Sequence, residues 1–241
     1  MMSKLIYRHF AAGKRAIFLS VCISLAIFAI ALLLHLSTIF GNLKDTGITE
    51  HPVYPYLFSV TLMLSAMTPM LSDFVSASIK SDYASGFARY ISASPVTPSE
   101  DVFSCYAAAV FHTLAMLLLT AAYLAVFIAL GVIKSEPSVF LPLIVMGVAD
   151  MSVIAVMIPC MLAKDEVKAY FLQFILVTVP IVLLSGSPGD EVEAFVTKLS
   201  AMFNIFPAAG AAISAVVPAL FLAISFAVSV KIKKGRLYSD G

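Results

Sequence analysis

Apolar residues fall along this chain in six long blocks that are separated by short polar segments. Each block approaches or exceeds the roughly 20 residues that a helix needs to cross the hydrocarbon core of a bilayer. None shows the alternating segments of about 10 residues that are typical of a membrane β-barrel. The blocks predict membrane-spanning helices over residues 16–40, 53–75, 99–132, 138–163, 168–186 and 207–230. We therefore expect an all-α, polytopic membrane protein in which residues 1–241 form a single transmembrane domain.

The polar segment between the second and third blocks, residues 76–97, has a helical pattern of its own. Its apolar side chains recur at the spacing of one helical face: Ile79, Tyr83, Phe87, Tyr90 and Ile91. Pro95 cannot continue such a helix. Thr97, Pro98 and Glu100 then match a capping box with proline in the first turn. The pattern predicts a short amphipathic helix over residues 79–91, a break, and a capped membrane helix.

Composition and charge agree with a membrane location. The chain is 61% hydrophobic and 12% charged, with a mean hydropathy of +1.01, whereas soluble domains are about 25% charged. With the N-terminus in the cytoplasm, only Lys44, Lys134 and Lys198 of the 15 Lys and Arg residues lie outside. The positive-inside rule then predicts a multi-pass protein of the cell membrane with both termini cytoplasmic. Residues 1–15 are basic and amphipathic, as expected for an interfacial helix.

Sequence motifs for chemistry are missing. The chain has no G-x-x-x-x-G-K-[ST] nucleotide loop and no H-E-x-x-H zinc motif. Its three cysteines lie far apart within apolar blocks, which favours neither a metal site nor a disulfide framework. A net charge of +1 gives no reason to expect nucleic acid as a partner. We expect a protein that is not an enzyme and that holds no cofactor of its own.

The run Arg89-Tyr90-Ile91-Ser92-Ala93-Ser94-Pro95-Val96-Thr97-Pro98-Ser99-Glu100 resembles the cytoplasmic loop of ATP-binding-cassette (ABC) type-2 permeases. In that family a basic-aromatic helix leads into a Leu-Pro-Val-Ser-like turn, an acidic residue and the third span. Six spans, cytoplasmic termini and a basic amphipathic start are also similar. The chain departs from the family pattern in having Pro98 where an Arg is frequent, and Cys105-Tyr106 where a Lys-Tyr pair is frequent.

The resemblance implies a function and a set of partners. Residues 76–97 would be a coupling loop that docks in a groove of a separate ATPase subunit, which would bind the ATP and Mg. The docking residues it implies are Ile79, Tyr83, Phe87, Arg89, Tyr90, Ile91 and Pro95. A second permease subunit, identical or different, would complete the channel, and residues 187–206 would form an extracellular hairpin. The expected cargo is amphipathic or hydrophobic: a cytolytic or antimicrobial peptide, a drug or a lipid.

Polar side chains inside the second and fifth spans have two readings. Thr61, Ser65, Thr68 and Ser72 form one stripe of the second span, with Met67 beside it. Such hydroxyls commonly bond helices together. The alternative is a cavity wall for an amphipathic cargo, to which methionine would give an adaptable surface. The family resemblance favours the second and fifth spans as cavity lining, which adds Gln173 and Thr178.

Asp150, His35 and His112 are ionisable residues within the predicted spans. A lone carboxylate at the position of Asp150 is costly, so it should be protonated, paired or facing water. Depth along the helices places His35 toward the outer leaflet and His112 toward the inner one, so neither is an obvious partner. Asp150 is then either a neutral, structural residue or a proton site. The second reading would make the chain a proton-coupled secondary transporter, and a non-transporting immunity or scaffold protein is a further alternative.

The sixth span carries a stripe of small residues. Alanines recur every fourth position, at 211, 215, 219, 223 and 227. Small side chains let a second helix approach closely. We expect this stripe to pack against another helix, either within the subunit or across a dimer.

Overall fold

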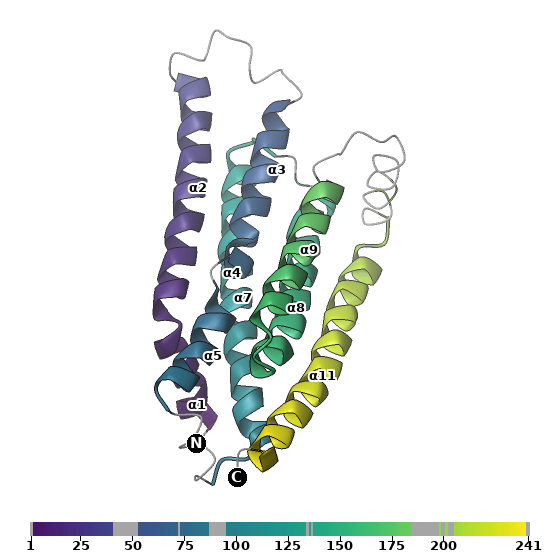
Figure 1. The fold of residues 1–241 in the computed structure, drawn as a ribbon. Coiled ribbons are helices and arrows are strands. Elements are labelled where there is room, and N and C mark those ends of the chain that lie inside the picture. The colour runs from purple at the N-terminus through teal and green to yellow at the C-terminus, as the bar shows by residue number, and fades with distance from the viewer. Residues whose placement is uncertain are drawn as a thin grey trace.

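The computed structural model describes residues 2–40, 53–71, 73–86, 95–133, 135, 137–184, 198, 201 and 205–239. The secondary structure of this part of the chain is helical, as predicted (Figure 1). The helices are α1 (Met2–Ala12), α2 (Lys14–Phe40), α3 (Val53–Ala66), α4 (Thr68–Leu71), α5 (Phe74–Ala84), α7 (Pro98–Ala129), α8 (Leu141–Leu162), α9 (Glu166–Leu184) and α11 (Pro207–Ser239), with a short 3-10 helix, η3 (Pro137–Phe140).

Four of these helices are long and apolar enough to cross a bilayer: α2, α7, α8 and α11. These four helices, all among the described residues, support the assignment of the chain as a membrane protein. The predicted extracellular hairpin, residues 187–206, lies almost entirely outside the described residues.

Helix α8 occupies the centre of the bundle. It packs against α3, α7, α9 and α11, and 61% of its most apolar stretch is buried, against 17% in α2 and α11. The outer helices instead expose large apolar side chains, including Phe18 on α2, Leu118 on α7 and Ile224 on α11. Such an outer surface suits lipid tails rather than water.

The second predicted span, residues 53–75, is divided among three helices. Helix α3 ends at Ala66, α4 covers only Thr68–Leu71, and α5 begins at Phe74. Proline has no N–H, so Pro69 cannot donate to the carbonyl of Ser65. The hydroxyl of Thr68 donates to that carbonyl instead, at 2.8 Å. Asp73, with φ of 55°, adopts the left-handed conformation just before α5.

The predicted start of α7 is confirmed. Thr97 accepts a hydrogen bond from the backbone N–H of Glu100 at 3.2 Å. The Glu100 carboxylate accepts one from the backbone N–H of Thr97 at 2.8 Å, and Pro98 is the first helical residue. Both bonds satisfy amide groups that the first turn of a helix leaves without a partner.

The predicted amphipathic helix over residues 79–91 is wrong in its extent. Helix α5 runs from Phe74 to Ala84 and closes at Ser85 and Gly86, whose φ is +70°. A left-handed φ suits glycine because it has no Cβ, and it commonly marks the end of a helix. Residues 87–94 lie outside the described residues.

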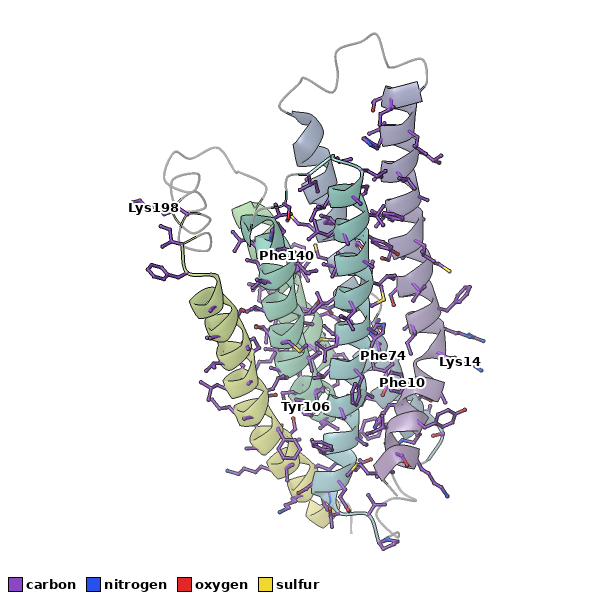
Figure 2. The ribbon with its side chains drawn as sticks, turned by 180° about the vertical axis from the view of Figure 1, so that it is seen from behind. Phe10, Lys14, Phe74, Tyr106, Phe140 and Lys198 are labelled. Atoms are coloured by element: carbon purple, nitrogen blue, oxygen red, sulfur yellow. The ribbon has the colours of Figure 1, made fainter. Side chains whose placement is uncertain are left out.

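Helix α1, which covers most of the predicted interfacial segment, lies at the same end of the bundle as the C-terminal end of α11 (Figure 1). We call this the terminal end. The Phe10 and Phe74 rings pack against each other with centroids 5.9 Å apart (Figure 2). Gly13 makes this approach possible, because a Cβ there would lie 2.4 Å from the Phe74 ring. The turn between α1 and α2 therefore seats α1 against α5.

Candidate functional site

The terminal end contains a partly buried cluster of charges that joins four helices. A guanidinium nitrogen of Arg8 on α1 lies 3.0 Å from a carboxylate oxygen of Asp82 on α5 and 2.9 Å from one of Asp101 on α7. The ammonium of Lys233 on α11 pairs with the other oxygen of Asp101. We call Arg8, Asp82, Asp101 and Lys233 the terminal ionic cluster. Its formal charges balance, as expected of ionic groups removed from water.

His9 extends the cluster into the interior. Its Nε2 lies 2.9 Å from a guanidinium nitrogen of Arg8 and its Nδ1 lies 2.6 Å from the Ser78 hydroxyl. Because a guanidinium can only donate, Nε2 accepts and the proton of a neutral ring lies on Nδ1, where it donates to Ser78. Burial, together with the positive charges of Arg8 and Lys233, lowers the pKa of His9 to about 3. His9 is thus a neutral connector between α1 and α5.

Helix α5 is also bonded to α9 and to the turn before it. The hydroxyl of Tyr170 on α9 lies 2.8 Å from that of Ser76 and donates to the Asp73 carboxylate at 3.2 Å. Lys80 pairs with Glu166 at 2.8 Å. In the α8–α9 turn, the Lys164 ammonium lies 5.4 Å from the centre of the Tyr83 ring. Together with the terminal ionic cluster, these contacts tie α5 to α1 and α9 directly, and to α7 and α11 through Arg8 and Asp101.

The predicted docking residues do not form one exposed face. Ile79 is only 4% exposed and packs in the hydrophobic core, so its assignment as an anchor for a soluble partner is corrected. Tyr83, 38% exposed, and Pro95 do lie at the surface. Phe87, Arg89, Tyr90 and Ile91 lie outside the described residues.

A second polar site lies deeper in the bundle, around Asp150 on α8. Asp150 is 1% exposed, and within the described part of the chain neither of its carboxylate oxygens has a hydrogen-bond partner. It lines a small cavity with a volume of about 20 Å³, which is roughly enough room for one water molecule. We call this cavity the Asp150 pocket. The other residues that line it are Pro69, Asp73, Phe74, Val75, Ala109, His112, Thr113, Val153, Ile154, Met157 and Gln173.

His112 lines the same pocket as Asp150, although no hydrogen bond joins the two among the described residues, in keeping with the expectation that they are not partners. His112 Nε2 lies 3.1 Å from the Ser20 hydroxyl of α2, and its ring packs against Phe74 with centroids 4.9 Å apart. His35, the other histidine predicted within the spans, is buried near the opposite end of α2 and does not line the pocket.

Three of the predicted cavity residues, Ser65, Met67 and Thr68, are buried in the bundle and do not line the pocket. The Ser65 hydroxyl lies 2.6 Å from that of Ser24 on α2 and 3.1 Å from that of Thr120 on α7. Met67 and Thr68 are also buried, whereas Ser72 lies outside the described residues. Thr61 and Thr178 are half-buried and do not line the pocket. Among the described members of the predicted set, Gln173 alone lines it.

Both sites have features that the sequence patterns did not reveal. Asp82, Asp101 and Lys233 look like ordinary charges at helix ends, and only their long-range pairing shows that they act together. Asp101 follows the capping residue Glu100 directly, which conceals its separate role.

Among the described residues, no three His, Cys, Asp or Glu side chains gather as a metal centre. Comparisons with protein-family models, curated proteins and solved structures found no match to this chain.

Proposed function

We propose that the chain is the membrane-spanning permease subunit of an ABC-type exporter, driven by a separate ATPase subunit that binds ATP and Mg. In this proposal the chain crosses the cell membrane six times and its terminal end faces the cytoplasm. The ATPase docks at the connection between α5 and α7, whose residues resemble the coupling loop of type-2 permeases.

The observation that carries the proposal is the bonding of α5 at the terminal end. Arg8 joins Asp82, before the connection, to Asp101, after it. Lys233 extends the same cluster to α11, and Tyr170 and Glu166 link α5 to α9. A force applied to the α5–α7 connection would therefore be transmitted to several helices at once. Transport further requires that ATP or cargo bind the two states of the bundle with different affinity.

Cargo would pass at a surface between two permease subunits. The Asp150 pocket is small, with a volume of about 20 Å³, so we place the cargo path elsewhere. On α11, the alanines at 215, 219, 223 and 227 are exposed. They form a stripe that a second subunit could approach closely, as small residues allow in membranes.

The assignment is tested by recovering the partner. The full chain, carrying an affinity tag, is solubilised in detergent from its native membranes and exposed to a photoreactive ATP analogue. We expect the label on a separate, copurifying protein with a P-loop and none on the chain itself. Label on the tagged chain, or transport that continues after ATP depletion, would overturn the proposal.

A second candidate is a proton-coupled secondary transporter, and the burial of Asp150 without a hydrogen-bond partner favours it. Intramembrane carboxylates of this kind occur in proton relays. The two candidates differ in energy source. A protonophore stops transport at constant ATP if the second is correct, whereas ATP depletion at a constant proton gradient stops it if the first is correct.

A further inference from the structure

The helix that passes the Asp150 pocket is interrupted beside it. Pro69 of α4 and Asp73, at the start of α5, both line the pocket, and they lie on either side of the break between these two helices. Irregular backbone at membrane depth is tolerated only where it is buried in protein or lines a cavity. In transporters, broken helices mark the sites at which ions bind. The break and the buried carboxylate therefore point independently to the same place.

The side chains around the pocket offer oxygen atoms to an occupant. Asp150 and Asp73 have carboxylates, Thr113 has a hydroxyl and Gln173 has an amide oxygen. Within the described residues, no lysine or arginine lines the pocket, and His112 contacts the Ser20 hydroxyl. Oxygen ligands of this kind suit hard cations, whereas softer metals prefer thiolate or imidazole.

Charge balance selects a singly charged ion. Asp73 lies at the exposed edge of the pocket and accepts a hydrogen bond from Tyr170, whose hydroxyl is also contacted by Lys80. Because water screens the charge of the exposed Asp73, Asp150 is the buried carboxylate among the described residues that an ion in the pocket would have to compensate. A divalent ion would leave an excess positive charge in a medium of low dielectric constant, where isolated charges are costly.

We propose that the Asp150 pocket binds one small monovalent cation of sodium size, which replaces the proton on the Asp150 carboxyl. The pocket volume of about 20 Å³ admits a single occupant of roughly the size of a water molecule. Asp150 and Thr113 bind the ion from the interior, and Asp73 attracts it at the edge. The site is a property of this chain alone and does not depend on an ATPase partner.

The test measures sodium binding to the purified full chain in detergent, without any other subunit. Thermal unfolding is followed by circular dichroism while sodium chloride replaces choline chloride at constant ionic strength. A ligand that binds only the folded state raises the midpoint, here by about 3 °C or more for each tenfold increase above the dissociation constant. Radioactive sodium, counted on the retained protein, should bind at a ratio of one per chain.

Variants separate the site from general salt effects. Asp150→Asn should lose the sodium response and the bound radioactivity, and Thr113→Val should weaken sodium affinity about tenfold, as expected for loss of one ligand. Asp165→Asn, which removes an exposed carboxylate from the α8–α9 turn, should keep the full response. If Asp150→Asn does not fold, the sodium affinity of Thr113→Val and the number of sodium ions bound per wild-type chain test the proposal instead. A midpoint that follows pH but not sodium, with no bound radioactivity, would mean that the pocket takes a proton only and would overturn the proposal.

Discussion

The guanidinium of Arg8 lies 2.9 Å from a carboxylate oxygen of Asp101, which joins the N-terminal helix to the start of α7. The other oxygen of the same carboxylate pairs with Lys233. One residue thus compensates two cations that come from opposite ends of the chain. Removing it leaves Arg8 and Lys233 close together with Asp82 as the remaining carboxylate of the cluster.

The first prediction concerns this shared carboxylate. Asp101→Asn should lower the free energy of unfolding by about 3 kcal/mol, because it breaks a buried ionic pair and leaves charge uncompensated. The matched control is Glu166→Gln, which breaks the exposed pair with Lys80. That change should cost no more than about 1 kcal/mol, as is usual for surface pairs. Thermal unfolding in detergent compares the two, and equal effects would show that the terminal ionic cluster does not stabilise the fold.

The second prediction concerns pH. Burial and neighbouring cations lower the pKa of His9 to about 3, from an ordinary value of 6.5. Between these values the unfolded chain binds a proton at His9 and the folded chain does not. Stability therefore falls as the pH falls through this window, by on the order of 1 kcal/mol per unit.

His9→Gln isolates that contribution, because glutamine can still accept from Arg8 and donate to Ser78 but does not titrate. Burial raises the pKa of Asp82, against the effect of Arg8, and this acts with the opposite sign near the acid end of the window. Asp82 is present in both proteins, so it cancels in their difference. Parallel stability curves for the wild type and His9→Gln between pH 4 and pH 6.5 would contradict the assignment of a neutral His9.

How much of the fold and of the candidate site the sequence predicts depends on how far apart in the sequence the interacting residues lie. Thr97 and Glu100 form a local capping box, so the sequence alone located the start of α7 correctly. The pocket required contacts among helices, and helical depth along the chain did not reveal that His112 and Asp150 both line it. Apolar periodicity also counted Ile79 on a surface face, whereas tertiary packing buries it in the core. A helical face predicts burial, but not whether the partner belongs to the same chain.

The third prediction tests pairing of two copies through α11. Ala219→Cys, in a background with Cys22→Ser and Cys160→Ser, should form a disulfide-linked dimer in membranes under mild oxidation. Ala219 is exposed on this chain, and small-residue stripes allow close approach of two helices. Leu118→Cys, at an exposed position on α7, is the control and should cross-link weakly. Equal cross-linking at both positions would indicate random collision, and no cross-link at Ala219 would remove α11 from a homodimer interface.

The last prediction separates docking of an ATPase from packing within the chain. Tyr83 is exposed at the end of α5, and Phe87 follows it closely in the sequence. If they anchor α5 to the ATPase, Tyr83→Ala or Phe87→Ala should weaken recovery of that subunit by tenfold or more, since a few aromatic anchors dominate most interfaces. Ile79→Ala should instead lower thermal stability by about 2 kcal/mol or more, the usual cost of truncating a buried aliphatic side chain.

The control for these variants is Tyr7→Ala, because Tyr7 is 73% exposed on α1, away from the α5–α7 connection in sequence. It should leave both recovery and stability unchanged. Detergent pull-downs over a range of ATPase concentrations, normalised to folded chain, give the comparison. Loss of recovery with Ile79→Ala alone would mean that packing, not docking, governs association. Equal recovery for Tyr83→Ala, Phe87→Ala and the wild type would exclude this segment as the site at which an ATPase binds.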